Sequence, residues 1–398
     1  MKGNNFFKIK LKNESTILFE KRKSPVSTIM VGFNVGSSHE VARKKGIAHF
    51  VEHNLFKGST SRTQQEISSG IEKKGGILNG FTADETTAYW AKIPAEHTSY
   101  ALDILSDMAF NPKFSIEEMR KERKVILEEI KMYHDNPQMF VLDELKKRLY
   151  LEPFNIGGLG TIKTVNNLSH EDIKNWHSLY NTKNLIVSIV GNVNIKEILN
   201  YLNKIKTPNI AKTNDPIINK TFSQKIFSRK GIDQAHLCLG FHVPSMASKE
   251  KYAIDLFNTI LGEGMSSLLF QEIREKRGLV YSIKSFIDSE KSYGYLAIYA
   301  GTDKKKIKEV KEISLKMIKQ VQKINHADFE QAKEQCIGSW EVANERSDNV
   351  AKNLLFNEIA NKAEDYYNYI EEINKLKMRD IIKFSNISNY GMTALVPK

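Results

Sequence analysis

Residues 46–58 read Gly46-Ile-Ala-His-Phe-Val-Glu-His-Asn-Leu-Phe-Lys-Gly58, and His49-Phe-Val-Glu-His53 is the most informative motif of the chain. The pattern from residue 46 to 56 predicts a short helix, on which His49 and His53 share one face. Two imidazoles placed in this way can bind one zinc ion. Glu52 lies close to the same face and can accept a proton from water. The spacing is H-x-x-E-H, the inverse of H-E-x-x-H; the alternative is a surface helix with two unrelated histidines.

A second helix can supply the third protein ligand that a catalytic zinc normally needs. Ser115-Ile-Glu-Glu118 fits a capping box, helical periodicity continues to about Tyr133, and Asn136-Pro137 ends the helix. One face of this helix carries the positions i, i+3, i+4 and i+7, which are Glu122, Val125, Ile126 and Glu129.

Carboxylates inside an otherwise apolar stripe need a partner, which can be a metal or a charged group. We therefore predict Glu129 as the third zinc ligand. Glu122 is predicted to support a ligating histidine through a hydrogen bond. Glu128 points away from this face, and we expect it to meet solvent. For Glu122 alone, an ordinary salt bridge is the alternative.

These two segments together resemble a known family. Residues 46–58 are similar to the zinc-site segment of the pitrilysin/insulinase metallopeptidases, in particular of the short branch that contains mitochondrial processing peptidase and bacterial homologues. Residues 122–129 are similar to the family's third-ligand helix, in which the ligand matches Glu129 and the accompanying acid matches Glu122. The non-catalytic subunits of the family lose the metal motif, so the resemblance implies an active peptidase with one zinc ion (Zn2+) per chain.

The resemblance also covers a predicted substrate-binding strand. Residues 75–82, followed by Thr87-Ala-Tyr89, look like the family's substrate-docking edge strand. An exposed strand edge can add an extended peptide through main-chain hydrogen bonds. The alternative for the asparagine is a turn residue beside a glycine. The resemblance implies four substrate-binding residues, Asn79, Gly80, Phe81 and Thr82.

A second signature lies farther along the chain. Residues 261–281 are similar to a family segment in which an arginine and a tyrosine reach the scissile region, and these match Arg274 and Tyr281. A guanidinium can hold a peptide carbonyl or carboxylate, and a phenol can stabilise a developing oxyanion. The alternative is an ordinary helix-end arginine and a packed tyrosine.

The chain divides near its midpoint. Turn signals at Thr207-Pro-Asn209 and Asn214-Asp-Pro216 interrupt the pattern, and Val31-Gly-Phe-Asn-Val-Gly-Ser37 has an echo 208 residues later in Leu239-Gly-Phe-His-Val-Pro-Ser245. We predict a zinc-binding catalytic half (1–207), a linker (208–222) and a related second half carrying the arginine and tyrosine (223–398).

The predicted fold class is α+β, in which each half is a mostly antiparallel sheet with helices packed on one face. Thr16–Glu20 and Val26–Val35 are predicted to be neighbouring strands, residues 77–93 a strand region, and Leu185–Val190 a further strand.

Composition limits the other function classes. The 398 residues include 59 Lys+Arg and 47 Asp+Glu, a formal charge of +12, with lysines dispersed along the chain. Dispersed charge without an aromatic-basic motif argues against nucleic-acid binding. Cys238 and Cys336 are expected to be buried free thiols in a reducing compartment. Residues 1–12 predict a first strand rather than a signal peptide, and no apolar run approaches a membrane span, so we expect a cytoplasmic protein without a membrane partner.

The resulting prediction is a zinc-dependent endopeptidase that cleaves short or unfolded peptides, with Glu52 activating water. The resemblance implies that two chains form a chamber. We expect a homodimer, with a heterodimer containing a metal-free homologue as the alternative. Two rival classes remain: a non-catalytic peptide-binding or assembly subunit of a processing-peptidase-like complex, and a basic surface that binds nucleic acid or acidic proteins.

Overall fold

Two sheets organise the chain in the computed structural model, which describes residues 5–208 and 213–398. The contacts divide it into two compact units. The first unit consists of Met1–Lys131, Gly157–Pro216 and Ala343–Tyr367, and the second of Met132–Ile156, Ile217–Val342 and Asn368–Lys398. The predicted α+β class with one mostly antiparallel sheet in each half is confirmed.

The sheet of the first unit has six strands in the order β1-β2-β6-β3-β5-β4, and only β2 and β6 run parallel. The strands are β1 (Phe6–Lys10), β2 (Thr16–Lys21), β3 (Val26–Phe33), β4 (Ile77–Thr82), β5 (Thr87–Pro94) and β6 (Leu185–Gly191). The prediction that Thr16–Glu20 and Val26–Val35 are neighbours was wrong, because β6 lies between them. Every residue of β6 is buried, which suits an interior strand, but an apolar run does not specify its partners.

Helices from the first half cover one face of this sheet. They are α1 (Ile47–Leu55), α2 (Gln64–Glu72), α3 (Thr98–Phe110), α4 (Ile116–Asp135), α6 (Ile162–Asn167), α7 (His170–His177) and α8 (Ile195–Leu202). Alternate residues of β3, namely Ile29, Val31 and Phe33, join the core beneath the helices. The same core takes Phe50 and Val51 from α1, so the predicted zinc helix is packed onto the sheet through its apolar side.

The second unit repeats this plan around five strands in the order β7-β11-β8-β10-β9. The strands are β7 (Gln224–Arg229), β8 (Ala235–His242), β9 (Val280–Ser289), β10 (Gly294–Thr302) and β11 (Gly391–Pro397). Its helices include α9 (Lys251–Gly262), α10 (Ile307–Gln320), α11 (His326–Ala343), α13 (Tyr369–Lys375) and α14 (Met378–Ile382). Leu239 and Phe241 of β8 pack with Phe257 and Leu261 of α9 in this core.

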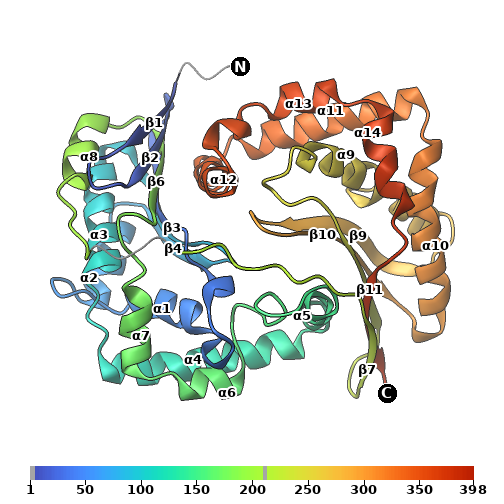
Figure 1. The fold of residues 1–398 in the computed structure, drawn as a ribbon, viewed down its shortest axis with the longest axis horizontal. Coiled ribbons are helices and arrows are strands. Elements are labelled where there is room, and N and C mark those ends of the chain that lie inside the picture. Colours follow the sequence, from blue (N-terminus) through green and yellow to red (C-terminus); the bar gives the residue numbers. More distant parts are fainter. Residues whose placement is uncertain (1–4, 209–212) are drawn as a thin grey trace. The chain divides into compact units, whose positions relative to one another are not determined.

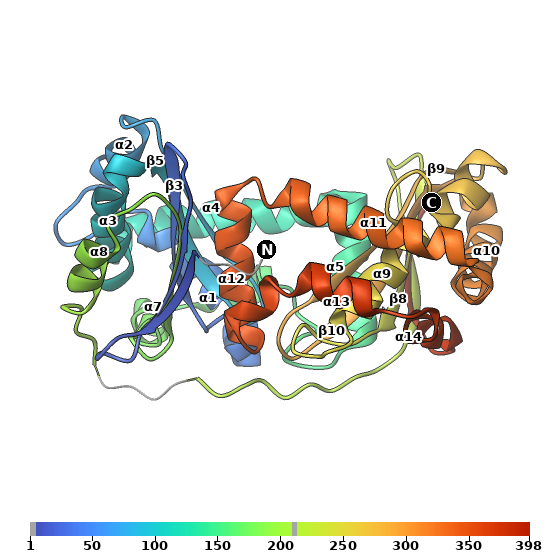
Figure 2. The ribbon, with the colours of Figure 1, turned by 90° about the horizontal axis from the view of Figure 1, so that it is seen from above.

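Each sheet also receives a helix from the other half of the sequence. Helix α12 (Ser347–Ala360) packs on β3 and β6, on the face opposite α3 and α8 (Figures 1 and 2). A Cβ at Gly32 would lie 2.6 Å from Leu355, so the missing side chain permits this close approach. Helix α5 (Pro137–Leu149) packs in the same way on β8 and β11 of the second sheet. The predicted division at the linker 208–222 does not assign α5 and α12 to the sheets on which they pack. Amphipathic periodicity shows that a helix has a buried face but does not identify what covers it.

Several smaller predictions can be placed on the structure. Cys238 and Cys336 are buried free thiols, as expected. Residues 1–4 of the predicted first strand and 209–212 of the predicted linker lie outside the described residues. Within the described part of the chain, no helix combines the length and apolar character needed to cross a membrane.

Candidate metal centre

Helix α1 is fixed at its start by a buried charged pair. The carboxylate of Glu40 accepts hydrogen bonds from the backbone N–H groups of Gly46 (3.1 Å) and Ala48 (2.8 Å), which belong to the first turn. The ammonium of Lys45 donates to the carbonyl of Ser37 at 2.7 Å and lies 3.8 Å from Glu40. Burial raises the pKa of Glu40 to about 7, and the charge of Lys45 opposes that rise. These bonds fix the helix start three residues before His49.

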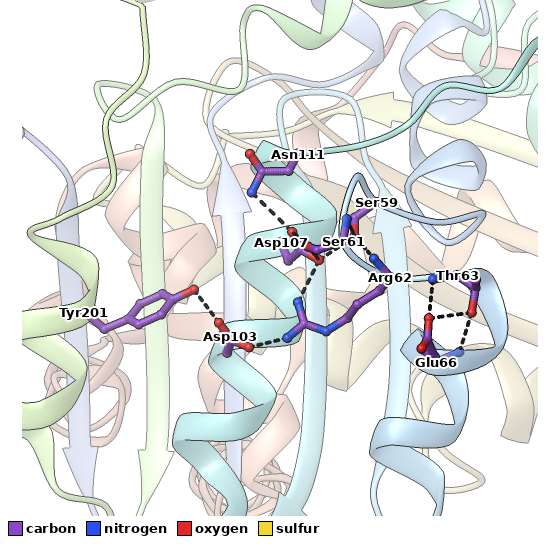
Figure 3. A network of polar contacts seen from close by, with 9 residues as sticks. All are labelled: Ser59, Ser61, Arg62, Thr63, Glu66, Asp103, Asp107, Asn111 and Tyr201. Carbon is purple, nitrogen blue, oxygen red and sulfur yellow. Dashed lines mark hydrogen bonds and ion pairs between the residues drawn. The ribbon is translucent and has the colours of Figure 1, made fainter.

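A polar network holds the loop after α1. Arg62 forms ion pairs with Asp103 and Asp107 of α3, the latter at 2.7 Å (Figure 3). Asp107 also accepts hydrogen bonds from Ser59 and, at 2.8 Å, from Ser61. The loop that follows α1 is therefore tied to α3, so both ends of the helix are held.

The three predicted ligands lie together. Nε2 of His49 is 3.7 Å and Nε2 of His53 is 3.5 Å from the same carboxylate oxygen of Glu129, and one ligand atom from each residue falls within 4.8 Å of the others. Ligand atoms that bind one tetrahedral zinc at about 2.0–2.1 Å are separated by roughly 3.4 Å. The described residues give this buried Glu129 oxygen no hydrogen-bond partner, and a metal ion would supply one. The donor set of two imidazoles and one carboxylate therefore fits zinc.

Glu122 lies beside the triad in the position predicted for it. Its carboxylate is 3.1 Å from Nδ1 of His53 and 2.6 Å from Nζ of Lys57. Burial raises the pKa of Glu122, but hydrogen bonds from His53 and Lys57 outweigh burial and leave it below the usual value. An ionised Glu122 orients the ring of His53 so that Nε2 faces Glu129. Both the predicted histidine support and the alternative salt bridge are present, because Lys57 pairs with the same carboxylate.

The pKa values of the two histidines are shifted in opposite directions. Burial, with a smaller contribution from the neighbouring His53, lowers the pKa of His49 to about 3, so its ring is neutral near pH 7. For His53, burial lowers the pKa, but the hydrogen bond to Glu122 and nearby carboxylates outweigh burial and raise it. A metal ion requires both rings neutral, so protonation of His53 competes with metal binding.

Glu52 is buried next to the triad. Its carboxylate accepts a hydrogen bond from the hydroxyl of Thr82 at the end of β4. Burial raises its pKa above the usual value, while the Thr82 hydrogen bond and the charge of His53 act in the opposite direction. A carboxyl group with a raised pKa is suited to taking and returning a proton near neutral pH.

The predicted docking strand is β4, the last strand of its sheet, so one of its edges has no partner strand in the described chain. Asn79 is exposed, and its side-chain oxygen accepts from the N–H of Gly80 at 2.8 Å, a local contact. Phe81 stacks on Phe356 of α12 with ring centroids 5.9 Å apart. A Cβ at Gly80 would lie 3.1 Å from the ring of Phe56, so this face of the strand rests directly on the region of α1. The substrate-binding roles stay predictions.

Arg274 and Tyr281 belong to the second unit. Arg274 lies on the π-helical turn η4 (Phe270–Glu275), where its guanidinium is 4.9 Å from the ring centroid of Phe270. Tyr281 lies on β9, the edge strand of the second sheet, and is 64% exposed. It is therefore not the packed tyrosine of the alternative interpretation. Their roles in catalysis stay predictions.

Sequence reasoning missed Glu40, Lys45 and Lys57 as parts of this region. Glu40 and Lys45 lie in a polar stretch that is typical of a solvated loop, and their full burial depends on contacts that no local pattern encodes. Lys57 was inside the quoted zinc segment, where its spacing of four from His53 was an available signal. Sequence reasoning also did not predict the hydrogen bond from the Thr82 hydroxyl to Glu52.

Two family models match successive parts of this chain. The family described as "Insulinase (Peptidase family M16)" matches residues 16–157, and "Peptidase M16 inactive domain" matches residues 167–336. A Bacillus subtilis protein named "Uncharacterized zinc protease YmxG" is 31% identical over 406 residues, covering 99% of this chain and 97% of the relative. An "Uncharacterized zinc protease" of Rickettsia felis is 32% identical, with coverage of 96% and 94%.

Solved structures have the same fold. A structure described as a protease from Helicobacter pylori superposes with a TM-score of 0.92 at 23% identity, covering 98% of this chain and 99% of that one. A Pseudomonas fluorescens structure, described as a peptidase M16 inactive domain, gives a TM-score of 0.89 at 18% identity, with coverage of 99% and 98%. At these identities the likeness concerns the fold alone.

Proposed function

Because this chain belongs to the insulinase family of peptidases, M16, we propose that it is a zinc-dependent endopeptidase that cleaves short or unfolded peptides. The observation that carries the proposal is the convergence of His49, His53 and Glu129 within 4.8 Å. The relatives named zinc proteases add support.

His49, His53 and Glu129 would hold the metal. A zinc ion in this site supplies Lewis acidity, which polarises a peptide carbonyl and lowers the pKa of water. Glu52 takes the proton from the attacking water and delivers it to the leaving amine, a role that suits its raised pKa. Glu122 and Lys57 keep the ring of His53 oriented throughout.

The unpaired edge of β4 would bind the substrate. An extended peptide can add to this edge by main-chain hydrogen bonds, which select for unfolded chain rather than for a particular side chain. We propose that Asn79, Gly80 and Phe81 line this edge. Arg274 and Tyr281 would act on the carbonyl side of the scissile bond in the assembled enzyme.

The experiment that tests this function is mass-spectrometric cleavage of a diverse mixture of unfolded peptides by the purified chain. We expect cleavage that a chelator abolishes and added zinc restores. Glu52→Gln is the matched catalytic control and should bind zinc without cleaving. Absence of cleavage by the folded, zinc-loaded chain would favour a non-catalytic peptide-binding subunit.

We propose a homodimer as the working assembly, on the strength of the family resemblance. Both the metal ligands and the Arg274/Tyr281 pair are present on this chain, so two copies contain every predicted site residue. Light scattering should give a mass close to 91 kDa, twice the chain mass of 45.5 kDa. A purely monomeric mass that persists in the active protein would contradict the homodimer.

A further inference from the structure

The hydroxyl of Thr82 faces Glu52 rather than the outer edge of β4. Side chains alternate along a strand, so Gly80 and Thr82 share the face of β4 that rests on α1. The close approach of Gly80 to Phe56 is consistent with this face. Thr82 uses its hydroxyl as a donor to the Glu52 carboxylate, and its main chain belongs to the predicted docking strand.

The end of β4 is held rigidly by a tight turn. Ala83 donates its N–H to the carbonyl of Thr86 at 2.7 Å, and the carbonyl of Ala83 accepts from the N–H of Ser37 at 3.0 Å. The hydroxyl of Ser37 donates to the side chain of Asp84 at 3.0 Å. A Cβ at Gly36 would lie 2.5 Å from backbone atoms of this turn, so the two segments are in direct contact. Thr82 therefore projects from a fixed backbone.

Glu52 needs such a donor because it is buried. A desolvated carboxylate without a hydrogen bond is costly, and a carboxylate with one donor from a rigid element has a restricted orientation. In the described part of the chain, the hydrogen bond that Glu52 accepts comes from Thr82. The same bond occupies one oxygen, Oε2, and leaves the other for a reacting proton.

We propose that Thr82 is a positioning residue that holds the Glu52 carboxylate in its working orientation; this inference rests on the proposed function. It differs from the substrate-binding role that the docking strand suggests for this side chain. A substrate-binding residue affects KM, whereas a residue that orients the base affects the chemical step and therefore kcat.

Thr82→Val and Thr82→Ser test the proposal in the zinc-loaded enzyme. Valine keeps the branched shape and removes the hydroxyl; serine keeps the hydroxyl. We expect Thr82→Val to lower kcat on the order of 10- to 100-fold with KM and zinc content unchanged, because a hydrogen bond to a charged group is lost. Thr82→Ser should restore most of kcat. Thr60→Val makes the same chemical change at an exposed turn and should leave kcat unchanged.

Three results would overturn the proposal: a raised KM at constant kcat, equal loss in the valine and serine variants, or full activity of Thr82→Val. Thermal unfolding of each variant checks folding; if Thr82→Val does not fold, Thr82→Ala provides the hydroxyl-free variant.

Glu52→Gln distinguishes failure of the proposed function from failure of the positioning role alone. If Glu52→Gln is fully active, the proposed function fails. If it is inactive while Thr82→Val is fully active, only the positioning role fails. Thr82→Val in the Glu52→Gln background should have no further effect on turnover.

Discussion

Helix α1 of the first unit and helix α9 of the second occupy matching places in repeated folds. Each follows the strand that carries the sequence echo, and the echo offset of 208 residues aligns His49, Glu52 and His53 with Phe257, Ile260 and Leu261. The three residues of α9 are all buried in the second core. Glu129 lies on α4, and the helix at the corresponding place in the element order of the second unit, α11, packs Ile337 against that core.

The two units differ in the polarity of the side chains at these places. At matching positions, the second unit buries apolar side chains, which stabilise it by transfer from water. The first unit instead places two imidazoles and two carboxylates there, of which His49 Nδ1 and Glu129 Oε2 have no hydrogen-bond partner in the described chain. The same scaffold therefore completes an apolar core in one unit and gathers the polar side chains of the proposed metal site in the other.

The largest expected effect is on turnover. Glu52→Gln should lower kcat on the order of 10²- to 10⁴-fold, because general-base catalysis contributes that range. Zinc content should be unchanged, since Glu52 is not among the three grouped ligands. Peptide-cleavage kinetics and metal analysis on the same preparation check both. Full activity in a correctly folded variant would mean that Glu52 has no catalytic role, like its apolar counterpart Ile260 in α9.

The second prediction compares stability without metal. Phe257→Ala should lower the free energy of unfolding by roughly 3–5 kcal/mol, the usual cost of emptying a buried aromatic site. His49→Ala at the matching position should cost less than about 1 kcal/mol, because its buried Nδ1 has no hydrogen bond to lose. Urea unfolding of both variants in chelator measures the contrast. Equal losses in the free energy of unfolding would contradict the inference that His49 contributes less to stability than Phe257.

A third prediction concerns the carboxylates of α4. Glu129→Gln should release zinc, because a neutral amide replaces a charged ligand. Glu122→Gln should weaken zinc binding by roughly 10- to 100-fold through the orientation of His53. Glu128→Gln is the matched control on the same helix, since Glu128 is exposed and pairs with Lys131 at 2.6 Å. Zinc titration against a competing chelator gives the affinities; unchanged affinity in Glu129→Gln would refute that ligand.

The last prediction concerns opposite pH slopes of stability in the two units. With the pKa of His49 lowered to about 3, the unfolded chain binds a proton below pH 6.5 that the folded chain does not, so stability falls as pH falls from 6.5 towards 3. Burial, with help from Glu263, raises the pKa of Asp255 in α9 to about 7 from 3.8, so its stabilisation is lost as pH rises towards 7 and above.

Two variants in metal-free protein isolate these slopes. His49→Gln should reduce the loss of stability between pH 6.5 and 4, and Asp255→Asn should gain most over the parent at pH 8. Thermal midpoints at pH 4, 6 and 8 provide the measurement. Parallel pH profiles for the parent and both variants would contradict the assignment of these shifts to His49 and Asp255.

Local patterns predicted much of the fold and the site. The spacing of His49 and His53 on one helix and the i, i+7 spacing of Glu122 and Glu129 on another identified the residues that the structure brings together. These are features of single helices, which periodicity describes well. Strand positions were also predicted from local sequence patterns.

Long-range partners could not be predicted in this way. The insertion of β6 between β2 and β3 and the exchange of α5 and α12 depend on which surfaces meet after folding. The burial of Glu40 with Lys45 and the contact of Thr82 with Glu52 have the same origin. A hydrophobic pattern indicates that a face is buried, but only the tertiary structure identifies the residues that cover it.

We propose that His49, His53 and Glu129 form a zinc site in the first unit. The most direct test is anomalous diffraction at the zinc edge from crystals of the zinc-loaded protein. We expect a single strong peak per chain, within bonding distance of Nε2 of both histidines and a carboxylate oxygen of Glu129. A peak elsewhere, or none in protein shown to be folded and zinc-saturated, would contradict it.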